Sequence, residues 1–390
     1  MPAPRLPAFD FDRLPGVTDE HRQVQEAVRA FVEGEIQPNA DAWDEAGGFP
    51  RELYRKAGEV GLLGLGYPAE YGGTPVDHVS KLLSSIELAR GGIGGVTAGL
   101  GSHTIMLWPV LAGAREHVRR AVIPAILAGE AIGALAITEP SGGSDVAQLQ
   151  TRAVRVPGGW AISGSKMFIT SGIRADHILV AARTGGPGAG GVSLFLVDGA
   201  SSGLTRTPLK KIGWWASDTA ALYFDEVFVP EDRLVGEENA GFRLVMQNFN
   251  GERMTMAAGG LGQAMACVED ALDWARERRT FGARLVEHQA IRHKLVRMID
   301  EILPVQAWLL QLAQRLDAGE SPAGDLALAK NHGARLMRDC ADQSLQILGG
   351  AGFLRGSRIE RAFRDCKVYM IGGGAEEVMN DLAAKQLGLL

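Results

Sequence analysis

The segment Leu135–Asp145, which reads LAITEPSGGSD, lies where the residue pattern changes from helical to extended. Its apolar start is typical of a strand, which runs into a glycine-rich turn that carries Thr138 and Ser144. Glycine lets the backbone N–H groups of such a turn approach a flat polar ring or an anion closely. These residues alone leave two interpretations equally open, a binding loop and an ordinary connection between domains.

Extended runs follow this segment at short intervals. Residues that alternate in polarity, or that are β-branched and aromatic, fill the stretches 151–163, 177–183, 191–198 and 220–230. Glycine or proline turns separate these stretches, so the pattern predicts an antiparallel β domain. The turn Gly186–Gly191 formally matches a dinucleotide-binding loop, but a strand-like run follows it where a helix is required. We interpret it as a hairpin loop.

Amphipathic segments flank the extended runs on both sides. Apolar residues recur at three- and four-residue steps in 21–36 and 79–90, and again in 242–249 and 267–279. Because 15 of the 17 prolines lie at or before Pro230, the C-terminal part is free to form long helices.

The glycines at 349, 350, 352 and 356 predict a break before a last helix near Ala375–Gly388. The sequence as a whole predicts an α+β protein with three domains. These are an N-terminal all-α domain over 18–130, a middle antiparallel β domain over 131–236 and a C-terminal helical domain over 237–390.

The composition is that of a globular protein. The chain has 390 residues, of which 46% are hydrophobic and 22% charged, and its formal net charge of −6 disfavours nucleic acid as a partner. Glycine is the exception, with 51 residues or about 13%, where roughly 7% is usual. The three cysteines form no CxxC pair, so the sequence predicts neither disulfides nor a structural zinc site. The chain also lacks an HExxH motif, so no other metal site is predicted. Without an 18-residue apolar run or a signal peptide, we expect a cytoplasmic protein; a mitochondrial matrix location stays open for a processed chain.

A second stretch with a possible binding role reads GSKMFIT, Gly164–Thr170. In a regular strand Phe168 and Thr170 share one side, where an aromatic face and a hydroxyl group could hold the edge of an isoalloxazine ring. An aromatic residue in a strand more often belongs to the core. Spacing alone leaves this undecided.

Six strings taken together resemble the acyl-CoA dehydrogenase family, and they occur in that family's order. They read LAITEPSGGSD (135–145), GSKMFIT…ADHILVAART (164–184), KKIGWWASDTAALYFDEVFVP (210–230), RRTFG…EHQ (278–289), LQILGGAGF (345–353) and ERAFRDCKVYMIGGGAEE (360–377). The resemblance extends from about Thr18 to the C-terminus.

The resemblance implies an N-terminal helical domain, a middle β domain and a C-terminal four-helix bundle. It also implies an FAD-dependent enzyme, commonly a homotetramer, that binds FAD between subunits. Such an enzyme oxidises the Cα–Cβ bond of an acyl-CoA thioester to the trans-2-enoyl-CoA and passes electrons to an electron-transferring flavoprotein.

Matching the family's motifs residue by residue gives the expected cofactor contacts. The flavin ring would meet Leu135, Ile137, Thr138, Gly143, Ser144, Phe168 and Thr170, with Phe168 in the place of the usual tryptophan. The cofactor of a neighbouring subunit would meet Arg278, Phe281, Gln289, Gln346, Gly349 and Gly350. Ala375 replaces a usual threonine whose lost hydrogen bond should weaken FAD binding by about 1 kcal/mol, and Glu377 would lie near the adenine end.

One position departs from the common family pattern. Most members carry their catalytic base as a glutamate where this chain has Gly373, and glycine cannot abstract a proton. Isovaleryl-CoA and long-chain acyl-CoA dehydrogenases use a glutamate on an earlier helix, and Glu252 stands at the matching place. The resemblance therefore implies Glu252 as base, with Glu376 and Glu377 as rivals.

The same resemblance implies the substrate contacts. Asn250 and Arg253 would contact the CoA arm, and the Gly373 backbone N–H would donate to the thioester carbonyl. Ser144 and Gly374 complete the expected set.

Two other functions stay open. A monooxygenase of the same fold, using reduced flavin and oxygen, could dispense with a carboxylate at 373. An acyl-CoA-binding protein that has lost its flavin is a non-enzymatic alternative. The acyl group is undetermined, because Gly94, Gly95, Gly99 and Gly101 either make room for a long or bulky tail or pack helices closely.

Overall fold

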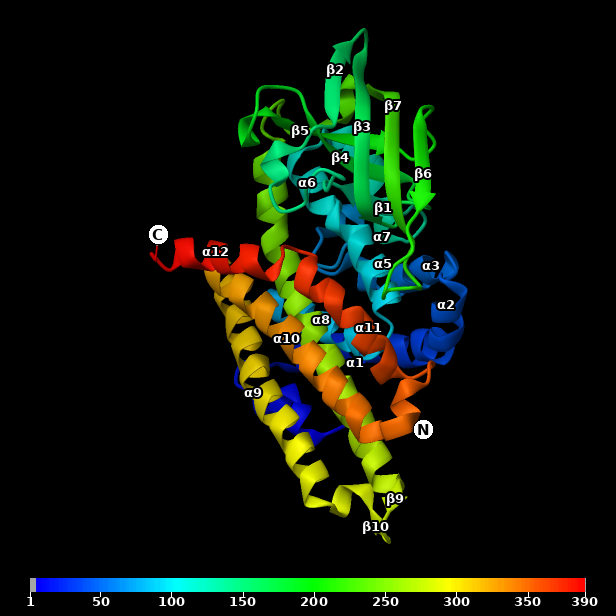
Figure 1. Ribbon diagram of the computed structural model, residues 1–390. Helices are drawn as coiled ribbons and strands as arrows, with labels where there is room; N and C mark the ends of the chain where they lie inside the picture. Colours follow the sequence, from blue (N-terminus) through cyan, green and yellow to red (C-terminus); the bar gives the residue numbers. More distant parts are fainter. Residues whose placement is uncertain (1–4, 390) are drawn as a thin grey trace.

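The computed structural model describes residues 5–389, except for the side chains of 102–104 and 250. A β domain lies at one end of the molecule and long C-terminal helices lie at the other (Figure 1). The N-terminal helices lie beside both. Among the described residues, no helix is long and apolar enough to cross a membrane.

The N-terminal part is helical, beginning where Thr18 caps the first helix. The Thr18 hydroxyl accepts a hydrogen bond from His21 N, and Thr18 N donates to His21 Nδ1 at 2.9 Å. The helices are α1 (Asp19–Phe31), α2 (Ala40–Ala46), α3 (Glu52–Glu59), α4 (His78–Arg90), α5 (Gly94–Ile105), α6 (Leu107–Gly113) and α7 (Glu116–Leu127).

The middle β domain is built on one eight-stranded sheet, in the order β6-β7-β3-β2-β4-β5-β8 with β1 beside β4. The strands are β1 (Gly133–Ala136), β2 (Arg152–Val156), β3 (Gly159–Thr170), β4 (His177–Arg183), β5 (Val192–Asp198), β6 (Leu204–Pro208), β7 (Thr219–Pro230) and β8 (Leu234–Val235). The predicted β domain is confirmed, although β4 pairs in parallel with β1 and β2. Gly186–Gly191 lies between the antiparallel neighbours β4 and β5, so it is the predicted hairpin loop.

The C-terminal part consists of long helices that proline does not interrupt except at Pro304 in α9. They are α8 (Gly241–Glu277), α9 (Gln289–Asp317), α10 (Ala323–Leu348), α11 (Arg358–Ile371) and α12 (Glu376–Gln386), with the short strands β9 (Arg279–Thr280) and β10 (Ala283–Arg284) after α8. The predicted break after residue 349 precedes two helices, because the amphipathic α11 lies between it and the last helix.

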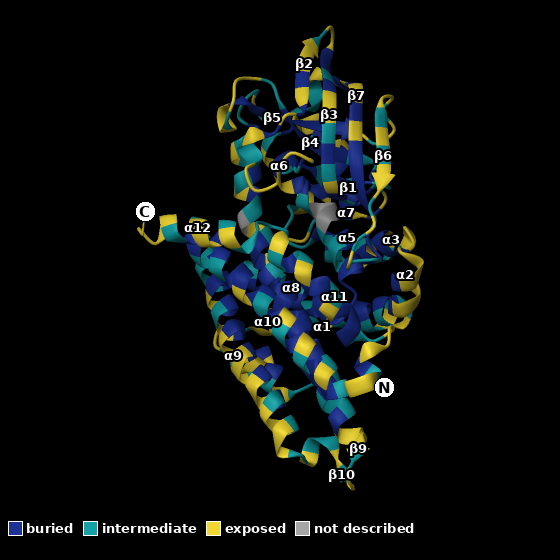
Figure 2. Cartoon of the chain, in the orientation of Figure 1, coloured by how far each residue is buried: buried dark blue, intermediate teal, exposed yellow. Residues whose placement is uncertain are grey.

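Helix α8 is the axis of the C-terminal part. It begins near the β domain and reaches the far end of the helices beside β9 and β10 (Figure 1). Its middle is buried, whereas α9 has an exposed outer face (Figure 2). A side chain at Gly260 on α8 would collide with the backbone of Gly333 on α10, and one at Gly333 would meet Ala257 O at 2.7 Å. The two backbones therefore lie in close contact.

Candidate active site

The predicted base and the glycine that replaces the family's usual glutamate lie side by side. Gly373 is in the loop between α11 and α12, with φ of +63°, a conformation that favours glycine. A Cβ atom at Gly373 would lie 2.5 Å from Met256 Sδ and 3.8 Å from Glu252 Oε1. Glu252 and Met256 are four residues apart on α8, so they share a helix face. The Glu252 carboxylate thus lies close to where a side chain at 373 would begin.

The Glu252 carboxylate is poorly solvated. Its Oε2 atom is buried and has no hydrogen-bond partner within the described part of the chain. Burial disfavours the charged form and raises the pKa of Glu252 to about 7, although the charges of Arg253 and Lys330 oppose this shift. A carboxylate with free lone pairs and a pKa near neutral has the properties of a general base.

The two rival glutamates have different surroundings. Glu376, the first residue of α12, forms an ion pair with Arg335 of α10. Glu377 is exposed to solvent. Within the described residues, neither has a buried carboxylate oxygen without a partner, as Glu252 has at Oε2.

The loop that carries Gly373 is held from one side by α10. Lys330 Nζ donates to Gly374 O at 2.6 Å, and Asn331 Nδ2 donates to Glu376 O at 2.9 Å. The α10 side chains thus fix both the loop and the start of α12. Sequence analysis did not identify Lys330, and its only signal was a lysine among the apolar residues of a helix.

The predicted substrate contacts have mixed surroundings. Arg253 is buried, and burial lowers its pKa while the charge of Glu252 raises it. Asn250 lies within α8, but its side chain is outside the described part of the structure. Gly374 has φ of +107°, so it too favours glycine, whereas Ser144 is exposed on the loop that follows β1 in the β domain.

The predicted flavin loop is anchored by a buried ion pair that sequence analysis missed. Lys166 Nζ donates to Ile137 O at 3.0 Å and to Glu139 Oε1 at 2.8 Å. The Glu139 carboxylate also accepts from the N–H groups of Gln150 and Thr151. Burial lowers the pKa of Lys166 to about 8, and the Glu139 charge opposes this shift. The anchored loop leaves residues 140–145 exposed.

Phe168 does not belong to the core, since its side chain is 67% exposed. The pairing of β3 with β7 shifts between Lys166 and Ile169, and Phe168 has φ of +62° at this bulge. Met167 N donates to Thr138 O at 2.8 Å, so Phe168 follows directly on the contact with the flavin loop. The buried Ile169 separates it from the half-buried Thr170. The bulge thus presents an aromatic ring to solvent beside the loop.

Arg278, in the second set of predicted cofactor residues, lies far from the predicted base. Glu252 and Arg278 are 26 residues apart along α8 and its end, which corresponds to about 39 Å at the helical rise. Gln289, Gln346, Gly349 and Gly350 are exposed, and Phe281 is fully exposed. One chain therefore does not bring the Arg278 end and the Glu252 end to a single flavin ring.

Three of the four α5 glycines are explained by packing. A side chain at Gly94 would meet Asp365 and Trp214, one at Gly95 the backbone at Ser217, and one at Gly99 the ring of Phe49, all at 2.5–2.8 Å. At Gly101 it would meet nothing within 4 Å. Close packing is thus the correct interpretation for Gly94, Gly95 and Gly99.

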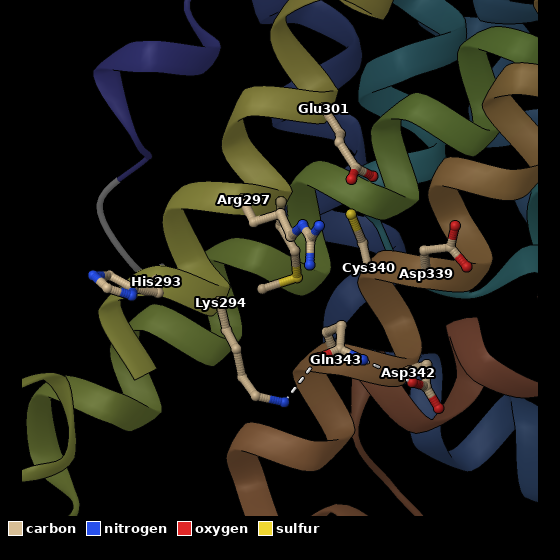
Figure 3. Close-up of a pocket in the computed structure, with 9 residues that line it drawn as sticks. His293, Lys294, Arg297, Glu301, Asp339, Cys340, Asp342 and Gln343 are labelled. Atoms are coloured by element: carbon tan, nitrogen blue, oxygen red, sulfur yellow. Dashed lines mark hydrogen bonds between the residues drawn. The ribbon is translucent and has the colours of Figure 1, made fainter. Parts of the chain in front are cut away.

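A separate groove of about 680 Å³ lies between α9 and α10 (Figure 3). Lys294 of α9 and Gln343 of α10 bridge it, with Lys294 Nζ donating to Gln343 Oε1 at 2.8 Å. None of the predicted catalytic, substrate or cofactor residues lines this groove. It is therefore distinct from the site around Glu252.

Three family models match the chain in succession. They describe the N-terminal, middle and C-terminal domains of acyl-CoA dehydrogenase, and they match residues 18–130, 134–227 and 239–388.

Individual relatives cover nearly the whole chain. The mitochondrial long-chain specific acyl-CoA dehydrogenase of Mus musculus is 33% identical over 95% of this chain and 87% of its own length. The mitochondrial isovaleryl-CoA dehydrogenase of Solanum tuberosum is 30% identical over 98% of this chain and 94% of its own. A crystal structure described as an acyl-CoA dehydrogenase from Mycobacterium smegmatis is 41% identical, with a TM-score of 0.93 over 95% of this chain and 98% of that one.

These matches define an oxidoreductase of a family that depends on FAD. The chain belongs to the acyl-CoA dehydrogenase family. Its three-part fold is that of the family, and the predicted resemblance is confirmed.

Proposed function

We propose that this enzyme oxidises an acyl-CoA thioester to the trans-2-enoyl-CoA, with Glu252 as the base that removes the α-proton. The observation that carries the proposal is the carboxylate of Glu252, whose Oε2 atom is buried without a hydrogen-bond partner in the described residues and whose Oε1 atom lies beside Gly373. A carboxylate in this state gains a proton readily at neutral pH, because burial raises its pKa to about 7.

Three kinds of group in this chain would take part in the reaction: a base, a hydrogen-bond donor to the thioester and residues that bind the CoA arm. Glu252 takes the α-proton, and the Gly373 backbone N–H donates to the thioester oxygen as negative charge develops there. Arg253 and Asn250 bind the CoA arm. Bound FAD would supply the acceptor for the hydride of the β-carbon, which would balance the two electrons lost by the substrate.

The predicted flavin residues fit such a cofactor. A Cβ at Gly142 would meet nothing within 4 Å, so the loop leaves open space where a flat ring can approach the backbone. The exposed ring of Phe168 beside this loop offers a stacking surface. Leu135, Ile137, Thr138, Gly143, Ser144 and Thr170 complete the proposed contacts of the ring.

The proposed assembly is a homo-oligomer, with a tetramer as the expected form, that shares each FAD between subunits. It is supported by the separation of about 39 Å between Glu252 and Arg278 along α8. Residues at the far end would hold the neighbour's cofactor, namely Arg278, Phe281, Gln289, Gln346, Gly349 and Gly350. Ala375 and Glu377 belong to the same proposed cofactor set. An electron-transferring flavoprotein is the proposed acceptor of the electrons.

A series of straight and branched acyl-CoA substrates of increasing length tests the reaction and identifies the acyl group. Mixed with the purified holoenzyme without oxygen, the preferred substrate should bleach the flavin absorbance and yield one 2-enoyl-CoA per flavin. Failure of every acyl-CoA to bleach the flavin contradicts the proposal. Substrate-dependent oxygen uptake with an external flavin reductant, without enoyl-CoA, would instead identify a monooxygenase.

A further inference from the structure

Lys330 is a buried lysine that contacts the glycine loop beside the proposed base. Its side chain is 1% exposed, and it lies on α10, which packs against α8. Its Nζ donates to Gly374 O at 2.6 Å, in the residue that follows Gly373. A buried ammonium group is costly unless hydrogen bonds and opposite charges compensate for the water it loses. No sequence motif assigned it one.

The hydrogen bond fixes the direction of the loop backbone. Gly373 and Gly374 have φ of +63° and +107°, so glycine leaves this segment with much conformational freedom. The Lys330 bond to Gly374 O and the Asn331 bond to Glu376 O restrain the segment from the α10 side. The Gly373 N–H, which would donate to the thioester, is separated from the Lys330 contact by a single intervening peptide unit.

The same ammonium group acts on Glu252 through space. Its positive charge lowers the pKa of Glu252 against the larger effect of burial. The charged groups that act on Lys330 are Glu252 and Arg253 from α8 and Glu376 and Glu377 from α12. Of these, Glu376 already pairs with Arg335 and Glu377 is exposed. Burial lowers the pKa of Lys330 to about 8, so it still carries most of its charge at neutral pH.

We propose that Lys330 is a positioning residue for the dehydrogenation, which holds the Gly373–Gly374 loop by its hydrogen bond and favours the ionised form of the Glu252 carboxylate by its charge. This inference rests on the proposed function. It gives Lys330 two separable effects, one on the loop and one on the base.

Three substitutions separate the two effects in the holoenzyme. Lys330→Gln keeps a donor without the charge, Lys330→Met removes both, and Lys330→Arg keeps the charge. Lys385→Met is the matched control, because Lys385 is an exposed lysine on α12. The rate of anaerobic flavin reduction by the preferred acyl-CoA is measured against pH. Flavin content and thermal unfolding of each variant establish that it is folded.

The charge effect predicts the pH at which the rate of flavin reduction falls on the acid side of each pH–rate profile, the acid limb. This limb should move up by roughly one pH unit in Lys330→Gln and Lys330→Met, because the base loses a neighbouring cation. It should stay in place in Lys330→Arg and Lys385→Met. An unmoved limb in both Lys330→Gln and Lys330→Met overturns the charge effect.

The loop effect predicts the plateau at high pH, where Glu252 is ionised in every variant. There Lys330→Met should be about tenfold slower than Lys330→Gln, since only glutamine can donate to Gly374 O. Equal plateaus overturn the loop effect. Glu252→Gln is measured in parallel. If it keeps its rate, the base assignment fails; if it loses its rate while the Lys330 variants match the wild type, only the role of Lys330 fails.

Discussion

Glu252 occupies a position that disfavours its ionised form. Its pKa rises from an ordinary 4.5 to about 7, so the folded chain holds a proton over a pH range in which the unfolded chain releases it. The unfolded state thus binds fewer protons there, and the contribution of this group to stability falls as the pH rises from about 4.5 to 7. The same burial that makes Glu252 a suitable base therefore destabilises the enzyme at neutral pH.

Replacing Glu252 with glutamine should stabilise the protein above pH 7, because it removes a buried charge and keeps the side-chain shape. The gain should be about 2–3 kcal/mol at pH 8 and vanish below about pH 4.5. Thermal or urea unfolding of both proteins across this range measures it. Asp381→Asn, at an exposed acidic residue of α12, serves as control and should show no such pH-dependent gain.

Sequence patterns identified which residues belong to the candidate site more readily than the side chains that surround them. The absence of a carboxylate at 373 and the presence of one at 252 led to the pair that the structure places together. Lys330, Met256 and Lys166 escaped notice because their roles depend on contacts with segments distant in the chain. Lys166 meets Glu139, 27 residues before it, only after β3 and the flavin loop have come together.

Helices and strands with one buried face could be predicted from the local spacing of apolar residues. The helical segment at 21–36 and the hairpin loop at 186–191 followed from short sequence signals. The parallel pairing of β4 with β1 and β2 did not, since register between distant strands is set by the whole sheet. The α5 glycines also required the structure, because only three-dimensional neighbours separate close packing from open space.

The contact between α8 and α10 depends on glycine at both sides. Gly333→Ala should cost about 2 kcal/mol of unfolding free energy, because its Cβ would lie 2.7 Å from Ala257 O and must push the helices apart. It should also slow flavin reduction, since Glu252 and Lys330 lie on these two helices. Gly34→Ala is the control, because nothing lies within 4 Å of the added Cβ in a helical segment; its stability should be unchanged or higher by up to about 1 kcal/mol. Equal stability of Gly333→Ala and the wild type contradicts the close contact.

At the scale of the whole molecule, the two ends of α8 would serve different cofactors. Phe281, between β9 and β10, is fully exposed, and Phe353, in the turn after α10, is 95% exposed. The Arg278 guanidinium makes no ion pair within the described residues, which leaves its paired donors available to a pyrophosphate. These features are expected of a surface that a neighbouring subunit and its FAD cover.

Arg278→Ala should weaken FAD retention at least tenfold, because two charge-assisted hydrogen bonds to the pyrophosphate are lost. The subunits that keep their flavin should still reduce it at a rate close to that of the wild type, since Glu252 is untouched. Flavin content after dialysis and the rate per bound flavin separate the two effects. Arg276→Ala, which breaks only a surface pair with Asp273, is the control. A slow rate per bound flavin with full retention would place Arg278 at the reaction site instead.

The rate of flavin reduction in Glu252→Gln, beside Glu376→Gln and the wild type, tests the central claim most directly. With the preferred acyl-CoA, without oxygen and at pH 8, Glu252→Gln should bind substrate yet reduce its flavin at least about a hundredfold more slowly, because the α-proton has no acceptor. Glu376→Gln should remain within about tenfold of the wild type. Near-normal reduction in Glu252→Gln, or a loss confined to Glu376→Gln, would contradict the assignment of the base to α8.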